Sequence, residues 1–558
     1  MVNLLEDPER IPPAGPPKNA SADRSADADY IPLTTGVWPG ALAGLPFLAP
    51  PAGPHPNRDR SINVWLDEQI WGHRLWDSQS PWLIFLEFLN VAEACESRGK
   101  LLVDDAHLSY QPRRRLFLRN ILFYSDDVER VAAQHSDSRR AWDEWLATIH
   151  ETAAGFPQPP DFSYLRDRFH NFADFAEVVH MLRATAVERQ SNKRWTSRFL
   201  FPFGVHALFI DLNAKPGAMS REYINFGRSG ELLYLMLARS SGRDELVANI
   251  RKILHGQEKW DRLVAALQPD DAGTDQTDDR VPAGSSCYLP YQRHPVFDEL
   301  AADWLAAFRL ELPGFDVYPH LVTLGALHLF RYHLSAASAW SDSDGRPYLV
   351  CEIVAPRKTL VREVSLRTYG QNDALSARAV EQFVERVRNS DAWIRAAASG
   401  EFAQCQEVLR EALCWDEDRH SSDPDAALAD LKVEALKRHQ RHAAQVHRTY
   451  GREIGLVSRR GTNRFRYAPT DQLIRTLMLA TVDHRMEFGE FLQLLFAKYR
   501  MVIGAREAEQ VLPAEEFDSS AFQDNARRLE QRLVSLGLLR RLSDACAYVE
   551  NPYGRAQA

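Results

Sequence analysis

A regular apolar stripe near the end of the sequence constrains the fold more than any other feature. The stripe consists of Phe522, Ala526, Leu529, Leu533 and Leu536. These residues recur at spacings of four, three, four and three, which places all of them on one side of an α-helix. Gly537 follows directly, and glycine is a typical helix C-cap. The pattern predicts a helix over residues 521–536 that packs against other elements through its apolar side.

The residues around this helix predict a small domain of three helices followed by a β-hairpin. Apolar spacing indicates two earlier helices, over residues 471–482 and 486–500. Residues 538–550 have the pattern of a strand, a polar turn and a second strand. We therefore expect residues 467–558 to fold together, with an acidic insertion at residues 501–520 before the third helix.

This order of elements resembles that of bacterial winged-helix domains. Residues 525–539, NARRLEQRLVSLGLL, are similar to the third helix and wing entry of such domains. The resemblance implies that the third helix enters the major groove of DNA and that the hairpin contacts the backbone or minor groove. The DNA contacts that it implies are Arg527, Arg528, Arg532, Arg540 and Arg541. Winged helices also serve as protein-interaction modules, and the acidic insertion would shield the third helix if it folded across it.

The net charge of the chain hides a local basic segment. The 558 residues include 67 Lys and Arg and 76 Asp and Glu, for a net charge of −9. Residues 437–466 alone carry +8, since Glu453 is their one acidic residue, and the remaining residues carry −17. The basic residues of this basic stripe are Lys437, Arg438, Arg441, Arg448, Arg452, Arg459, Arg460, Arg464 and Arg466.

A basic stripe in an acidic protein indicates an anionic partner. Tyr450, Phe465 and Tyr467 are interleaved with the basic residues, and aromatic rings beside arginine are suited to stacking on nucleic acid. The alternative is a solvated basic helix and turn, or one that the acidic remainder of the protein covers.

Composition divides the rest of the sequence into parts. Residues 1–60 hold 12 of the 31 prolines and no sustained period, which predicts a disordered or extended tail. Residues 61–268 are expected to form a tryptophan-rich, mainly helical domain, residues 269–286 an acidic linker and residues 287–415 a mixed α/β domain. Residues 416–466 combine a polar linker with the basic stripe. The expected fold class is mainly α with small β elements (α+β), in a multi-domain protein that ends in a winged helix-turn-helix.

No complete catalytic motif is found. HExxH and GxSxG are absent, and the six cysteines form no CxxC pair. Restriction-type nucleases need carboxylates and a Glu-x-Lys pair around Mg²⁺. The segments that approach this pattern are Asp342, Asp344, Glu352 and Lys358, and Asp211, Asn213 and Lys215. The first lacks lysine two residues after the glutamate, and the second has Asn213 in place of a second carboxylate. We expect a non-catalytic protein without cofactor or metal.

Two segments are similar to accessory subunits of bacterial anti-phage defence systems. They are residues 61–73, SINVWLDEQIWGH, and the pattern over residues 525–553. The resemblance implies a non-catalytic subunit that binds nucleic acid, duplex DNA in particular, beside a helicase, methyltransferase or nuclease. The alternatives are a protein-interaction scaffold without DNA contact and a divergent Mg²⁺-dependent nuclease. Without a secretory signal or a segment long enough for a bilayer, we expect a cytoplasmic protein with no membrane partner.

Overall fold

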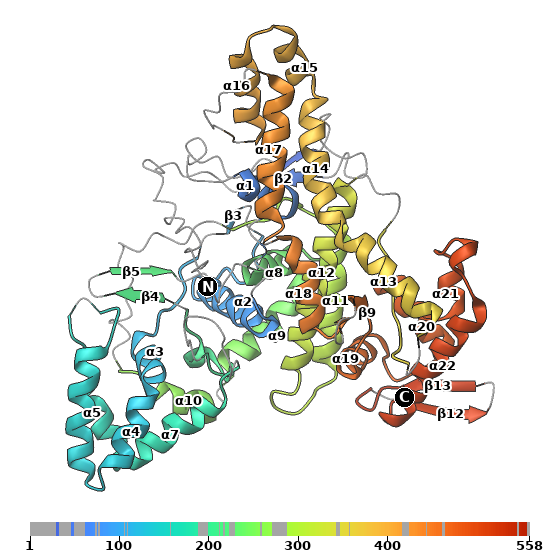
Figure 1. The fold of residues 1–558 in the computed structure, drawn as a ribbon. Coiled ribbons are helices and arrows are strands. Elements are labelled where there is room, and N and C mark those ends of the chain that lie inside the picture. The colour runs from blue at the N-terminus through green and yellow to red at the C-terminus, as the bar shows by residue number, and fades with distance from the viewer. Residues whose placement is uncertain are drawn as a thin grey trace, which may run out of the picture.

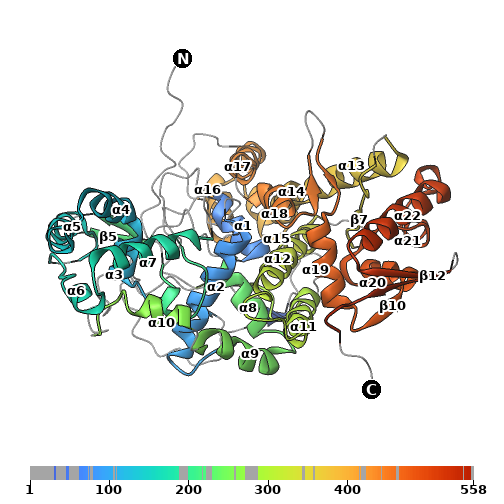
Figure 2. The ribbon, with the colours of Figure 1, turned by 90° about the horizontal axis from the view of Figure 1, so that it is seen from below.

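The computed structural model is mainly helical with several small sheets (Figures 1 and 2), which confirms the expected class at that level. The structure describes residues 30–32, 46–48, 62–72, 75, 79–104, 107–108, 110–156, 158–187, 199–210, 212–215, 218–221, 229–256, 259–270, 287–341, 346–355, 358–413, 415, 423–441, 443–459, 464–543 and 546–554. Most of the expected Pro-rich tail and acidic linker lies outside these residues.

A long buried helix, α12 (Tyr318–Trp340), lies at the centre of the fold. It is apolar around most of its circumference, which is typical of a helix surrounded by others. The helices that pack against it include α2 (Pro81–Glu96), α11 (Pro295–Arg309), α14 (Leu375–Arg388) and α18 (Ala443–Glu453). Helix α2 is buried along almost its whole length, so it is a core helix as well.

Helix α2 begins where the sequence places a cap. The Ser80 side chain accepts a hydrogen bond from the Leu83 N–H, and Pro81 occupies the first turn, where proline costs no hydrogen bond. Helix α8 (Ser229–Ala238) approaches α2 closely at Gly230, where an added Cβ would lie 2.6 Å from the Glu87 Cβ. Glycine at this position allows the two backbones to pack together.

Among the described tryptophans of the N-terminal half, Trp71, Trp142 and Trp145 are buried in the core, whereas Trp260 is 36% exposed. Trp71, at the end of α1 (Ile62–Trp71), is buried and stacks on His333 of α12 and on His439 of α17 (Pro424–His439), with ring centroids 4.9 and 5.5 Å apart. Its indole N–H donates to the His333 carbonyl at 3.0 Å. Trp71 thus joins three helices that are far apart in sequence.

The buried imidazole of His333 makes stability depend on pH. Burial, followed by the nearby His439 and His447, holds the pKa of His333 well below its usual value of about 6.5. Below pH 6.5 the unfolded chain binds a proton that the folded chain does not, so this contribution to stability is present above that pH and is lost as pH falls. We expect His333→Phe, which keeps the ring stack, to reduce the pH dependence by about 1.4 kcal/mol per pH unit below 6.5.

Urea unfolding at several pH values between 7.5 and 5.5 measures this difference. The exposed His170→Gln serves as control, because His170 lies on the surface. An unchanged pH dependence in His333→Phe would contradict the assignment of this histidine as a buried neutral group.

A group of small helices forms one end of the molecule (Figures 1 and 2). Its helices are α3 (Leu116–Phe123), α4 (Ser125–Gln134), α5 (Ser138–Thr152), α6 (Tyr164–Arg168) and α7 (Phe172–Ala184). A 3₁₀ turn at Val205–Ala207 precedes α8 in the chain. Helices α9 (Arg243–His255) and α10 (Lys259–Ala265) follow α8. Small antiparallel pairs are β1 (Tyr30–Pro32) with β2 (Pro46–Leu48), β3 (His107–Leu108) with β6 (Cys287–Tyr288), and β4 (Leu212–Lys215) with β5 (Ala218–Arg221).

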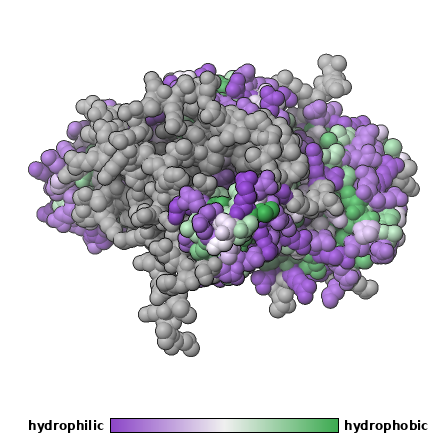
Figure 3. Space-filling model, turned by 90° about the horizontal axis from the view of Figure 1, so that it is seen from above, coloured by the Kyte–Doolittle hydropathy of each residue, from purple (hydrophilic) through white to green (hydrophobic). Residues whose placement is uncertain are grey.

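Four helices project from the body at the top of Figure 1. They are α14, α15 (Asp391–Ala398), α16 (Phe402–Leu413) and α17, with α15 against α16 and α14 against α17. Seen from this side, the apolar areas of the described surface are interspersed with hydrophilic residues (Figure 3).

The C-terminal unit lies at the end of the molecule opposite the small-helix group (Figure 2). Its elements are α19 (Asp471–Thr481), β10 (Arg485–Glu487), α20 (Phe488–Tyr499), β11 (Met501–Val502), α21 (Ala505–Glu509), a 3₁₀ turn at Ala514–Glu516, α22 (Ser519–Ser535), β12 (Leu539–Ser543) and β13 (Cys546–Glu550). Three of its strands form an antiparallel sheet in the order β10-β13-β12. Helix α22, which carries the apolar stripe, and the hairpin of β12 and β13 lie where the sequence predicts them.

The second helix of this unit begins later than expected, because residues 485–487 form a strand. Pairing with β13 holds these residues extended, with Arg485 opposite Glu550. The Glu487 carboxylate then accepts hydrogen bonds from the N–H groups of Gly489 and Glu490, which starts α20.

A buried segment from the middle of the sequence joins the C-terminal unit to the body. Strand β7 (Leu349–Val350) pairs in parallel with β11. Asn525 of α22 accepts a hydrogen bond from the Ile353 N–H at 2.8 Å and donates to the carbonyls of Cys351 and Ile503 at 3.0 Å. Among the described residues 347–355 of this segment, Leu349 and Val350 form strand.

Candidate nucleic-acid interface

The basic stripe follows three elements: the end of α17, helix α18, and the hairpin of β8 (Val457–Ser458) and β9 (Arg466–Tyr467). A tight turn at Gly455 leads into β8. Its φ of +77° and an added Cβ only 2.2 Å from the Thr470 Oγ1 both require glycine. The exposed members of the stripe are Lys437, Arg441, Arg452, Arg459 and Arg464, with Arg448 partly exposed. Arg460 and the Arg438 side chain lie outside the described residues.

Arg466 faces the interior and does not belong to the exposed basic surface. It is 1% exposed and forms an ion pair with Glu352, which is fully buried. The expected contact of Arg466 with nucleic acid is corrected on this ground, because the guanidinium is turned inward to pair with the buried Glu352 carboxylate. The sequence pattern shows that residue 466 is charged, but it does not show whether the side chain faces the surface or the interior.

Phe465 is the interleaved aromatic residue that reaches the surface. Tyr450 and Tyr467 are buried, and their hydroxyls bond to Ser229 (2.6 Å) and His447 (2.8 Å) respectively. Phe465 is partly exposed, and the guanidinium groups of Arg448 and Arg459 lie 5.6 and 5.3 Å from its ring centroid. These cation–π contacts hold two positive charges against a partly exposed aromatic ring.

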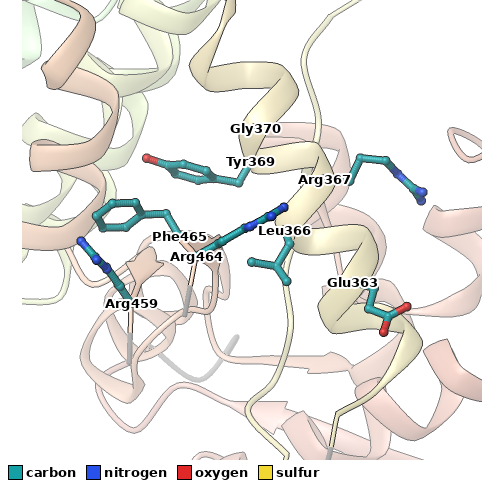
Figure 4. A pocket seen from close by; sticks show the side chains of 8 residues that line it. All are labelled: Glu363, Leu366, Arg367, Tyr369, Gly370, Arg459, Arg464 and Phe465. Atoms are coloured by element: carbon teal, nitrogen blue, oxygen red, sulfur yellow. The ribbon is translucent and has the colours of Figure 1, made fainter. Parts of the chain in front are cut away.

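A pocket of about 700 Å³ lies between the hairpin and helix α13 (Leu360–Asp373). The residues that line it are Glu363, Leu366, Arg367, Tyr369, Gly370, Arg459, Arg464 and Phe465. Figure 4 shows Tyr369, Phe465 and Arg459 one after another at one end, with Glu363 at the other. The pocket therefore combines an aromatic wall with three guanidinium groups.

The aromatic wall is fixed from behind. The Tyr369 and Phe465 ring centroids are 5.7 Å apart, and Tyr369 also packs on His447 at 4.8 Å. Burial, reinforced by the Asp373 carboxylate, raises the pKa of Tyr369 above its usual value, so the hydroxyl stays protonated. The aromatic wall formed by Tyr369 and Phe465 is therefore uncharged, and its rings are held in place by their packing contacts.

Two of the pocket's guanidinium groups are free of ion pairs with described carboxylates. Arg459 and Arg464 are exposed, and their contacts within the described chain include no salt bridge. Arg367 pairs with Glu516 of the acidic insertion at 2.7 Å and extends away from Tyr369 across α13 (Figure 4). An incoming anion would thus meet two available positive charges beside the aromatic wall.

Most predicted arginines of the C-terminal unit are paired within it. Arg527 pairs with Asp524 at 2.6 Å, Arg541 with Glu530 at 3.1 Å, and Arg532 with Asp471. Arg528 is partly buried, and Arg540 is exposed. The structure does not bring these arginines together with the pocket residues, but it leaves the outer side of α22 exposed at Gln523 and Gln531.

The acidic insertion packs beside α22 without covering that outer side. Helix α21 contacts α22, and the Glu507 side chain is buried, where it accepts a hydrogen bond from the Gly504 N–H. Shielding of the third helix, considered from the sequence, is not seen in the described residues.

Arg485 was not anticipated from the sequence. Its guanidinium lies 3.8 Å from the Tyr548 ring centroid, and Arg540 is the residue opposite Tyr548 in the sheet. The three side chains therefore share one face of the three-stranded sheet. Residues 546–550 were predicted to form a strand, which places Tyr548 on one of its faces. Residue 485 belongs to a strand that the apolar pattern of the sequence did not predict.

The segments considered for a nuclease do not assemble a metal site within the described residues. Glu352 is bound to Arg466, whereas Asp211, Asp342 and Asp344 lie outside those residues. Within the described part of the chain, no three His, Cys, Asp or Glu side chains are grouped to hold a metal ion. No described helix is both long enough and apolar enough to span a bilayer.

No protein-family model, curated protein or solved structure significantly matches this chain. The function must be inferred from the pocket, the basic surface and the C-terminal unit themselves.

Proposed function

We propose that this protein binds nucleic acid through the surface formed by α13, α18 and the β8–β9 hairpin. The observation that carries this proposal is the exposed pair Arg459 and Arg464, without ion pairs to described carboxylates, beside the partly exposed ring of Phe465. Guanidinium groups neutralise phosphates, and aromatic rings stack on bases.

We propose further that the C-terminal unit is a winged-helix module and a second contact with DNA. The order α19-β10-α20-α22-β12-β13, which β11 and α21 interrupt between α20 and α22, and the sheet order β10-β13-β12 support this proposal. Arg485 and Arg540 flank Tyr548 on the sheet, and the side of α22 that carries Gln523 and Gln531 is open. Arg485, Arg527, Arg532 and Arg541 would have to exchange their present carboxylate partners for phosphates.

We propose that the protein works as a non-catalytic subunit of an anti-phage defence complex. The sequence resemblance motivates this role, and exposed apolar residues at the end of α22 and on β12 supply a surface for a protein partner. These residues are Val534, Leu536 and Leu542, of which Val534 is 50% and Leu542 55% exposed. Apolar side chains this exposed are suited to partner contacts, which also supports a scaffold role as the second candidate.

Reversing the charge of the pocket arginines tests the proposed function. In Arg459→Glu/Arg464→Glu we expect duplex DNA binding to weaken by at least about tenfold at ~0.1 M salt. The slope of log K against log salt should fall by about 1.8, because two phosphate contacts are lost. Fluorescence anisotropy across a salt series measures both quantities.

The matched control is Arg388→Glu/Arg410→Glu, on the projecting helices. It makes the same change in net charge at Arg388, which is exposed, and Arg410, which is partly exposed, and neither side chain lines the pocket. Equal loss of binding in the two double variants would show a general charge effect, and undiminished binding in Arg459→Glu/Arg464→Glu would reject the proposed surface.

A further inference from the structure

We propose that the pocket between α13 and the β8–β9 hairpin accepts a single unpaired nucleotide, with its base against Phe465 and its phosphate at Arg459 and Arg464. This inference rests on the proposed function and names the form of nucleic acid that the surface selects. The ligand chemistry is that of a nucleoside monophosphate, either free or as one unit of a single strand.

The dimensions of the pocket suit one nucleotide. Its volume of about 700 Å³ falls within the range of about 300–1,000 Å³ that is usual for small-ligand sites. A base within a duplex has both faces covered by its neighbours in the stack, so only an unpaired or extruded base can lay its face on a protein ring.

The Phe465 end supplies the stacking surface. Phe465 is held by Tyr369 behind it, while the exposed guanidinium of Arg459 lies over its ring at 5.3 Å. Bases stack on aromatic rings and on guanidinium planes alike. An entering base can therefore either displace Arg459 from the ring or stack on it.

The charges of the lining residues orient the ligand. Arg459 lies beside the aromatic wall and Arg464 reaches from the hairpin across the pocket towards Leu366, whereas Glu363, the carboxylate among the lining residues, lies at the far end (Figure 4). A phosphate is attracted to the first end and repelled from the second. Arg367 is engaged by Glu516, and so Arg459 and Arg464 are the phosphate ligands.

Phe465→Leu tests the stacking, because leucine keeps apolar volume but has no aromatic face. The probes are oligodeoxyadenylate, a mixed-sequence duplex of the same length, and AMP. We expect Phe465→Leu to weaken oligodeoxyadenylate and AMP binding about tenfold, to leave duplex binding unchanged, and Phe465→Tyr to restore the loss. Equal effects on the single strand and the duplex, or no effect on either, would overturn the inference.

A second variant does not depend on the packing of Phe465. Arg464→Ala changes an exposed side chain that is assigned to the phosphate and not to the base, and it should weaken AMP binding about tenfold while leaving adenosine binding unchanged. An equal change in the affinities for AMP and adenosine, or no change in the affinity for AMP, would contradict the proposed phosphate contact.

The same titrations separate this inference from the proposed function. If the wild-type protein binds AMP through Phe465 but neither nucleic acid, the proposed function fails and the nucleotide pocket stands. If it binds duplex DNA and single strands with no contribution from Phe465, the nucleotide pocket fails and the proposed function stands. Thermal unfolding of each variant verifies that it is folded.

Discussion

Replacing Glu352 with alanine is expected to lower the free energy of unfolding by about 3–5 kcal/mol. The substitution leaves the Arg466 guanidinium buried without its carboxylate, at a site where both residues are essentially inaccessible to solvent. A buried charge without a partner is far more costly than a missing surface ion pair. Chemical unfolding compared with the wild-type protein measures the loss.

The hydrogen bonding of the Glu352–Arg466 ion pair suggests a second variant that removes both charges. The Glu352 Oε1 and Arg466 Nη1 atoms find no hydrogen-bond partner among the described residues, so the pair is incompletely compensated. Removing both charges in Glu352→Leu/Arg466→Met should recover most of the stability that Glu352→Ala loses. A loss below about 1 kcal/mol in Glu352→Ala would contradict this account, and the exposed Glu363→Ala is the control.

This result also decides how the nuclease alternative is tested. A Glu352→Ala protein that lost nuclease activity would have lost stability as well, so the loss would not identify a catalytic carboxylate. The companion variant separates the two explanations, because it restores stability without restoring a carboxylate.

Replacing Asp303 with alanine is expected to cost a similar amount, about 3–5 kcal/mol. Asp303 of α11 is fully buried, bonds to the His328 Nε2 at 2.7 Å, accepts from the Tyr499 hydroxyl at 2.9 Å, and pairs with Lys498. These partners come from α12 and α20, so one carboxylate connects three helices. Alanine would leave all of them without their common acceptor.

The direction of the pH effect follows from the same contacts. Burial alone would raise the pKa of Asp303, but His328 and Lys498 outweigh it and hold the pKa below its usual value. The contribution is therefore present above the unfolded carboxylate pKa of about 3.9 and is lost as pH falls through the lower folded value. Burial also lowers the pKa of His328, despite Asp303, so its imidazole is neutral at pH 7.

Unfolding of Asp303→Ala, Asp303→Asn and the exposed Asp316→Ala at pH 7 tests this network. Asparagine keeps the shape but not the charge, so its loss should be smaller than that of alanine. Asp316→Ala should stay within about 0.5 kcal/mol of the wild-type value. Equal stability of the Asp303→Ala and Asp316→Ala proteins would show that Asp303 does not hold the three helices together.

Local periodicity predicted the elements of the C-terminal unit well, but not the charge environments of its arginines. The apolar spacing of Phe522, Leu529 and Leu533 matches their burial in α22, because one helix face has to pack against the rest. The same sequence could not show that Arg532 pairs with Asp471, since that contact joins residues far apart in the chain.

The pocket was only half visible in the sequence for the same reason. Arg459, Arg464 and Phe465 belong to the predicted basic stripe, whereas Tyr369 and Arg367 lie about 90 residues earlier, on a helix without a distinctive motif. Tertiary packing brings the two segments together, and charge patterning along one segment cannot reveal it. Arg466 shows the converse, because a residue inside a basic run can be turned inward by a buried carboxylate from a distant segment, here Glu352.

The pairing of β7 with β11 delays the completion of folding in a newly synthesised chain, because the two strands are far apart in sequence. Leu349 and Val350 are synthesised about 150 residues before their partners Met501 and Val502, an interval of roughly 8–30 s at about 5–20 residues per second. Until then the Cys351–Ile353 backbone lacks Asn525. The middle of the chain thus emerges with an open strand edge that only residues about 150 positions later in the sequence can close.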